Sequence, residues 1–240
     1  MIAIVLWVIL SVVLELAIIP FQPFPSPASE EAIVVDEAFK ELMYFSAPVF
    51  AFVVVMVLYS MFRFRRRGEP AEDGPAMHGS KPLVYTWLAI TSALCLLVII
   101  TPGITGLREL RAHANEPPDL LVQMNGGRFY WQVTYPAYGI TSFNKELVLP
   151  QGELVRFEVT AADVLHSFWI PAFRAKIDAV PGKITSIDAI PNVIGDYASD
   201  FEYRVQCAEL CGLGHNGMRI PVRVVSEADF QAWVAANAKK

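Results

Sequence analysis

The side chains best suited to chemistry in this sequence lie close together, between residues 207 and 218. This stretch reads Cys-Ala-Glu-Leu-Cys-Gly-Leu-Gly-His-Asn-Gly-Met, so two thiols, an imidazole and a thioether follow at spacings of four, four and three residues. Thiolate and thioether sulfurs are soft ligands that favour copper or zinc over magnesium or calcium. The interspersed glycines allow a short loop to turn its donors toward one point. The pattern therefore predicts a metal site, and we favour a copper electron-transfer site.

A further ligand is available from His166, in the segment Leu-His-Ser-Phe-Trp-Ile-Pro at 165–171. Of the other histidines, His78 and His113 lie in polar connecting segments, where a solvated side chain is expected. His166 lies between an apparent strand and an apolar run, where a single histidine is more often a satisfied core residue. The donor cluster downstream makes a metal ligand the preferred interpretation.

Three other interpretations of the cluster are weighed against copper. Cys207 and Cys211 could form a disulfide in an oxidising compartment. Two cysteines and two histidines could hold tetrahedral zinc, but Met218 and Glu209 would then have no role. A mononuclear blue-copper site uses one cysteine with two histidines, so the second cysteine argues against it.

The composition indicates a membrane protein. The chain is 54% hydrophobic and 18% charged, whereas average soluble domains have about 25% charged residues. The net charge of −5 is mild and argues only against a strong nucleic-acid-binding surface.

Two long uncharged stretches account for the excess of apolar residues. Leu42–Phe62 has no charged residue over 21 positions and Pro82–Leu107 has none over 26, and a helix needs about 20 apolar residues to cross hydrocarbon. The arginine cluster at 63–67 places the connecting loop on the cytoplasmic side. Residues 40–107 are therefore predicted to form a transmembrane hairpin, and the chain after about Gly106 is predicted to lie on the outer side.

Residues 1–27 form an N-terminal apolar segment that has two interpretations, a signal peptide or a third transmembrane helix. A signal peptide usually begins with a positive charge, which is missing here, and Ser26-Pro27-Ala28 is only a fair cleavage site. We favour a retained helix. Within a membrane, Glu15 would be costly unless it faces a protein partner.

Residues 108–225 carry short alternating runs typical of strands with one buried face. The clearest runs are Val155–Val159, Phe201–Val205 and Met218–Val224, with further candidates at Leu120–Met124, Phe129–Tyr135, Glu146–Leu149 and Ile184–Ile190. About seven short strands predict an antiparallel sandwich or barrel. In residues 226–240, Ser226 followed by Asp229 predicts a helix start, and Phe230, Trp233 and Val234 give that helix an apolar stripe.

The 207–218 stretch resembles the copper A (CuA) ligand loop of cytochrome c oxidase subunit II. Asp163–Phe168 resembles the first-ligand segment of that family, and so does Lys176–Gly182, ten residues after His166. The likeness includes the hairpin and extends over residues 40–225. It implies transmembrane α-helices (the hairpin, with one extra N-terminal helix) followed by an all-β cupredoxin-type Greek-key barrel.

The resemblance also implies a ligand set. Cys207 and Cys211 would bridge two copper ions, and His166 and His215 would each bind one of them. Met218 and the backbone carbonyl of Glu209 would be weak ligands. The Glu209 side chain would bind a magnesium ion shared with subunit I, a task suited to a hard oxygen ligand.

The implied function is that of the electron-accepting subunit of a terminal oxidase. Electrons from a cytochrome c-type donor would pass through CuA to the haem of subunit I, where oxygen is reduced to water and protons are translocated. The partners would be subunit I, the other oxidase subunits and a periplasmic one-electron donor. The location would be the bacterial plasma membrane, rather than the mitochondrial inner membrane. The alternative is a membrane-anchored CuA carrier that serves a different reductase or is fed by a blue-copper protein.

Two positions depart from the usual pattern of the family. Where it commonly has Gln-Trp-Tyr-Trp, this chain has Arg-Phe-Tyr-Trp at 128–131, which leaves Phe129, Tyr130 and Trp131 as candidates for accepting electrons. Phe129 and Trp131 could equally be core aromatics. Val84 stands where many members have a glutamate near a proton route, although Glu69 or Glu72 could replace it.

Overall fold

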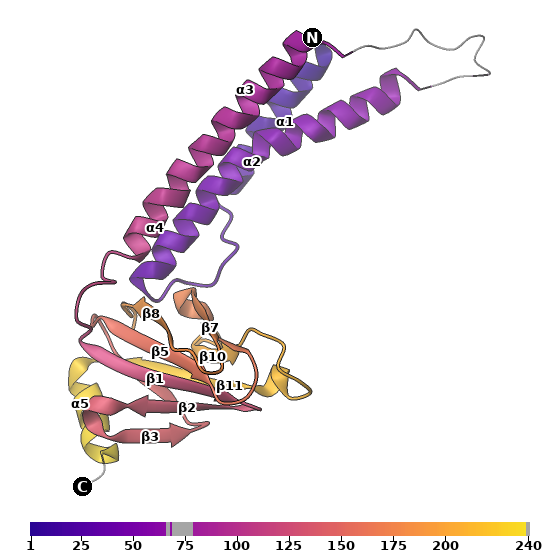
Figure 1. Ribbon diagram of the computed structural model, residues 1–240. Coiled ribbons are helices and arrows are strands. Elements are labelled where there is room, and N and C mark those ends of the chain that lie inside the picture. The colour runs from indigo at the N-terminus through magenta and orange to yellow at the C-terminus, as the bar shows by residue number, and fades with distance from the viewer. Residues whose placement is uncertain (66–67, 69–78, 239–240) are drawn as a thin grey trace. The chain divides into compact units, whose positions relative to one another are not determined.

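The computed structural model describes residues 1–65, 68 and 79–238, and Figure 1 shows their helices and strands. The chain divides into two compact units. The helical unit consists of Met1–Pro23 and Glu37–Arg108, and the β unit consists of Phe24–Asp36 and Glu109–Lys240. Of the residues noted in the sequence, Glu69, Glu72 and His78 lie outside the described part of the chain.

The helical unit contains the expected hairpin and the expected additional helix. Its elements are α1 (Ile2–Ile18), α2 (Glu30–Arg63), α3 (Lys81–Val98), a π-helical turn (Ile99–Ile104) and α4 (Thr105–Leu110), although the start of α2 up to Asp36 and the end of α4 from Glu109 belong to the β unit. Glu30–Arg63 and Lys81–Leu110 are each long and apolar enough to cross a membrane, whereas α1 is shorter. Their large apolar side chains are mostly exposed, which suits helices surrounded by hydrocarbon.

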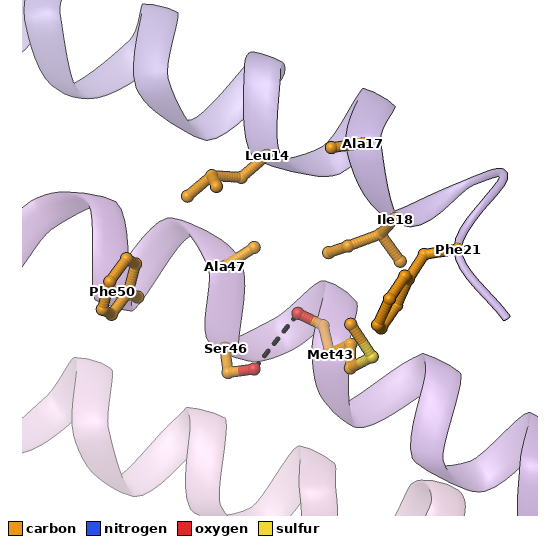
Figure 2. A pocket seen from close by; sticks show the side chains of 8 residues that line it. All are labelled: Leu14, Ala17, Ile18, Phe21, Met43, Ser46, Ala47 and Phe50. Atoms are coloured by element: carbon orange, nitrogen blue, oxygen red, sulfur yellow. Dashed lines mark hydrogen bonds between the residues drawn. The ribbon is translucent and has the colours of Figure 1, made fainter. Parts of the chain in front are cut away.

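Helix α1 packs along α2 through one polar contact and one aromatic contact. The indole Nε1 of Trp7 donates to the Pro48 carbonyl at 2.8 Å, and the rings of Trp7 and Phe52 meet edge to face at 5.8 Å. Small residues at Ala17 and Ala47 leave a groove of about 460 Å³ between the helices (Figure 2). Ser46 donates its hydroxyl to backbone carbonyls of its own helix, so the groove exposes almost purely apolar surface.

The β unit is built from two sheets that enclose one core. The first sheet has the order β3-β2-β1-β5-β8, and the second has the order β4-β11-β10-β6-β7 with β9 paired to β11. The strands are β1 (Leu120–Gly127), β2 (Tyr130–Tyr135), β3 (Ile140–Phe143), β4 (Leu147–Pro150), β5 (Val155–Ala161), β6 (His166–Ile170), β7 (Ala175–Ala179), β8 (Thr185–Ala189), β9 (Gly195–Asp196), β10 (Arg204–Cys207) and β11 (Arg219–Val225). The barrel-like all-β fold is confirmed.

Two details of the predicted sheet are wrong. Strands β1 and β5 are parallel, and so are β4 and β11, so the sheets are mixed and not wholly antiparallel. Each parallel pair joins strands that lie far apart in the sequence, which alternation within one strand cannot indicate. Phe201 was expected to share the buried face of Tyr203 and Val205, but it lies before β10 and its side chain is about half exposed.

The core is filled by the inward side chains of both sheets. The tilted rings of Phe157 and Phe168 lie 5.0 Å apart between centroids, and Trp131 meets Phe168 edge to face at 6.1 Å. The buried hydroxyl of Tyr135 donates to the Val148 carbonyl and accepts from the Val148 amide, both at 2.9 Å. Burial of a phenol requires such partners, and these two bonds fix β2 against β4.

Two further segments complete the β unit. Helix α5 (Glu227–Asn237) begins as predicted, with the Ser226 hydroxyl accepting from the Asp229 amide at 3.2 Å, and it buries Phe230 and Val234. The segment Phe24–Asp36 adds an edge: the Ala28 amide donates to the Ala172 carbonyl, and the Asn192 amide donates to the Ala28 carbonyl, both at 3.0 Å.

Candidate metal centre

The donor-rich stretch begins where β10 ends. The Cys207 amide donates to the Met218 carbonyl at 3.0 Å, which brings the two ends of the loop together. Inside it, the His215 amide donates to the Gly212 carbonyl and the Met218 amide donates to the His215 carbonyl. Gly212 has φ +132°, an angle that side chains rarely adopt. The loop is therefore held closed by its own backbone.

Strand β6 brings the further predicted ligand, His166, to this loop. It pairs antiparallel with β10, with Phe168 opposite Cys207, and the Ala208 amide donates to the Ser167 carbonyl at 2.9 Å. His166 is the first residue of β6 and its side chain is fully buried. His166 and Cys207, which are 41 positions apart in the sequence, thus meet at one end of the second sheet.

The predicted donors lie within a few ångströms of one another. The Sγ atoms of Cys207 and Cys211 are 3.8 Å apart, and the ligand atoms of His166, Cys207 and Cys211 all lie within 4.8 Å of one another. His166 Nδ1 lies 3.7 Å from Cys207 Sγ, and His215 Nδ1 lies 3.7 Å from Cys211 Sγ.

Two weaker donors lie beside the same sulfurs. Met218 Sδ lies 3.9 Å from Cys211 Sγ, and the Glu209 carbonyl oxygen lies 3.1 Å from Cys207 Sγ. The Glu209 side chain is exposed. All six residues selected from the sequence therefore come together, each sulfur with one imidazole and one weak donor close by.

The chemistry of this donor set fits a soft metal. Both cysteines are free thiols, and their Sγ separation is far longer than a disulfide bond. Burial and the neighbouring Cys207 raise the pKa of Cys211 to about 11, so this thiol keeps its proton at neutral pH until a metal displaces it. Two sulfurs, two imidazoles and a thioether are the ligands expected for copper.

Asp163 contacts the predicted ligand His166, and the sequence did not single it out, although it lies inside the Asp163–Phe168 segment. Its Oδ1 lies 2.9 Å from His166 Nε2 and accepts from the Val164 amide at 2.7 Å. Burial would raise the pKa of this carboxyl, but hydrogen bonds from His166, Val164 and Arg128 outweigh it and hold the pKa well below its usual range. An ionised Asp163 keeps the Nε2 proton of His166 and leaves Nδ1 free to bind metal.

The three candidate aromatic residues lie in different environments. Phe129 is 38% exposed and its ring covers the ligand loop, because a Cβ added at Gly214 would lie 2.4 Å from its Cδ2. Trp131 is fully buried and meets His166 edge to face at 6.3 Å, so it is a core aromatic. Tyr130 packs on Phe143 at 5.9 Å.

The remaining histidine of the described residues is not part of the site. His113 is exposed, and its Nδ1 lies 2.8 Å from Glu116 Oε2. This hydrogen bond raises the pKa of His113, although partial burial opposes it. This position agrees with the prediction that the His113 side chain is solvated.

Apolar helices joined to a β unit of this kind define a membrane-anchored cupredoxin-like protein with a cluster of soft ligands. Residues 138–225 match the family model "Cytochrome C oxidase subunit II, periplasmic domain", and residues 14–105 match the transmembrane domain of the same subunit. The chain belongs to the cytochrome c oxidase subunit II family. It is a cytochrome c oxidase subunit whose apolar helices fit a membrane anchor and whose β unit is of the periplasmic type.

The chain is similar to curated relatives and to one solved structure. The chain is 31% identical to a probable cytochrome c oxidase subunit 2 of Rickettsia bellii, covering 91% of this chain and 84% of the relative. It is 30% identical to cytochrome c oxidase subunit 2 of Thermostichus vulcanus, covering 89% and 78%. The periplasmic domain of subunit II of Bradyrhizobium japonicum cytochrome oxidase is 32% identical, covering 50% of this chain and 94% of that one, with a TM-score of 0.46.

Proposed function

We propose that this chain is the electron-accepting subunit of its oxidase. Electrons from a cytochrome c-type donor reach a binuclear CuA centre in the β unit and pass to the haem of subunit I. There, oxygen is reduced to water and protons are translocated. The observation that carries this proposal is the convergence of His166, Cys207 and Cys211, whose ligand atoms lie within 4.8 Å of one another.

In this proposal the thiolates of Cys207 and Cys211 bridge two copper ions. His166 and His215 each bind one copper through Nδ1, the nitrogen that lies 3.7 Å from a thiol sulfur. Met218 and the Glu209 carbonyl supply the weak ligands. A pair of copper ions sharing two thiolates supplies a one-electron centre with small reorganisation, because one charge is spread over both ions.

The protein contributes rigidity and burial. Cys207, Cys211, Met218 and His166 are buried, which excludes water from the donors. The loop is closed by its backbone hydrogen bonds and His166 is held by Asp163, so the donor positions are preorganised. No side chain at the site is poised to attack a substrate, which suits an electron relay.

The surroundings of the loop support two partner contacts. The exposed carboxylate of Glu209 would bind a magnesium ion shared with subunit I, since carboxylate oxygen suits that ion. Phe129 and the loop that its ring covers would form the contact for the electron donor. The chain would lie in a bacterial plasma membrane, with the β unit in the periplasm.

The copper content of the oxidase purified from membranes tests the proposal. We expect two copper atoms bound by this chain, counted apart from any metal of its partner subunits, with a multiline electron paramagnetic resonance (EPR) signal, haem absorbance and oxygen uptake. Cys211→Ser should abolish the multiline signal, because serine cannot bridge two copper ions as a thiolate does. Cys95→Ser is the matched control, since Cys95 is an exposed cysteine on α3, and it should leave the signal unchanged.

Two outcomes would contradict the proposal in different ways. One copper atom per chain, or zinc alone, would refute the binuclear centre. Two copper atoms without haem or oxygen uptake would favour the alternative of a carrier that serves another reductase.

A further inference from the structure

Arg128 links the two chain segments that carry the proposed metal ligands. Its backbone amide and its side-chain Nε both donate to Asp163 Oδ2, at 3.0 and 3.1 Å. Its side chain also passes the ligand loop, because a Cβ added at Gly212 would lie 4.0 Å from Arg128 Cδ. One residue thus touches both the His166 segment and the 207–218 loop.

The hydrogen bonds of Asp163 form a closed set. Its Oδ1 is engaged by His166 Nε2 and the Val164 amide, and its Oδ2 by the two Arg128 donors. A carboxylate offers about four acceptor positions, and here four protein donors use them. The carboxylate cannot rotate without losing one of these partners, and His166 is held through it.

The positive charge of Arg128 acts on His166 through the hydrogen bonds of Asp163. An ionised carboxylate bonded to a ligand imidazole makes that imidazole a stronger donor to metal. A guanidinium bonded to the other oxygen draws electron density away and weakens this effect. The Arg128 side chain is 53% exposed, whereas Asp163 is 28% and His166 0% exposed, so the charge reaches the buried ligand through the carboxylate.

We propose that Arg128 is a positioning residue that sets the reduction potential of the metal centre through Asp163 and His166. The inference rests on the proposed CuA function and deepens it. Arg128 itself touches no predicted ligand side chain, and its contact with Asp163 is divided between the backbone and the side chain. A substitution at 128 therefore removes the charge and leaves the amide of residue 128 to hold Asp163.

The test measures the potential of the copper centre in the purified oxidase by optical titration, without any protein donor. Arg128→Gln should lower the potential, because the carboxylate then donates more strongly through His166. Arg128→Lys should restore most of the wild-type value if charge is decisive. Pulsed EPR should show a changed nitrogen coupling for one imidazole in Arg128→Gln, which a merely structural role would not produce in a fully loaded centre.

Arg219→Gln is the matched control, because it also removes a positive charge close to the predicted metal ligands. Arg219 is exposed, follows the predicted ligand Met218 and lies over the Phe201 ring, 5.7 Å from its centroid. None of its hydrogen bonds within the described residues reaches Asp163. We expect a smaller potential shift than in Arg128→Gln and unchanged nitrogen couplings.

The outcomes separate this inference from the function on which it rests. Equal shifts in Arg128→Gln and Arg219→Gln, or no shift in the former, would overturn the role of Arg128 while two copper atoms and the multiline signal still support CuA. Absence of copper from the wild-type oxidase would overturn both.

Discussion

At the scale of single residues, the ligand loop depends on how closely Phe129 approaches its glycines. The ring lies against the backbone at Gly214, where a Cβ would fall 2.4 Å from Cδ2, and it also approaches Gly212. The absence of side chains at these positions allows an exposed aromatic ring to lie directly on the loop.

We predict that Gly214→Ala slows electron delivery to the oxidase and leaves copper bound. The added Cβ must push the Phe129 ring off the loop, so we expect the bimolecular rate with a cytochrome c donor to fall about tenfold, equivalent to about 1.4 kcal/mol of activation free energy. Stopped-flow reduction of the copper centre measures this rate.

Gly217→Ala provides the control for this substitution. Gly217 lies in the same loop, and a Cβ there would have no neighbour within 4 Å. An equal loss of rate in both variants would mean that the loop, and not the position of Phe129, had been disturbed.

Spacing and residue types suggested Cys207, Cys211, His215 and Met218 as donors, with His166 as a further one, whereas Glu209 was added only by the family resemblance. The sequence did not predict the role of Asp163 or Arg128, which are 35 residues apart and meet only when β1 and β5 pair in parallel. It also did not indicate that Trp131 is buried, because burial is decided by the packing of both sheets. Contacts of this kind depend on topology, which residue spacing does not report.

At the scale of elements, alternation predicted strands well where one face is buried and the other is exposed. All four residues of strand β4 are buried, so its two faces do not differ in exposure. It was predicted from its run of apolar residues. Strands β3, β6, β7 and β9 were not predicted. They are short, from two to five residues, and too few positions alternate to give a signal.

Helix α5 offers a test of a predicted cap. Ser226→Ala removes the acceptor of the Asp229 amide, and we expect the free energy of unfolding of the β unit to fall by about 1 kcal/mol. Ser186→Ala is the control, because Ser186 is an exposed strand residue of β8, and its effect should stay within about 0.5 kcal/mol. Urea unfolding followed by tryptophan fluorescence measures the free energy of unfolding of both variants. Similar losses in Ser226→Ala and Ser186→Ala would show that the cap does not stabilise the β unit.

At the scale of the whole molecule, the chain passes between the two units three times, at residues 23–24, 36–37 and 108–109. Between the first two crossings, Phe24–Asp36 is an integral edge of the β unit. Arg174, whose side chain is 8% exposed, forms two hydrogen bonds with the Asp36 carboxylate at 2.7 and 2.8 Å. Its guanidinium also donates to the Pro25 carbonyl and lies over the Phe24 ring.

We predict that Asp36→Asn destabilises the β unit by about 1–3 kcal/mol, because a largely buried guanidinium loses its charged partner. The value is below that of a fully buried pair, since Asp36 is 23% exposed. Glu37→Gln, at the neighbouring exposed position, should have little effect. Thermal unfolding of the detergent-solubilised chain distinguishes them, and an unchanged midpoint for Asp36→Asn would show that the pair is not stabilising.

The edge made by Phe24–Asp36 also bears on how a water-soluble fragment should be designed. Cutting the chain after the last membrane-spanning residue, near 109, would discard this segment. Ala28, Ser29 and Ala32, all buried in the intact chain, would be lost, and the Ile190 and Ala172 backbone groups that bond to it would face solvent. A fragment intended for copper reconstitution should therefore carry residues 24–36 joined through a flexible linker to residue 109.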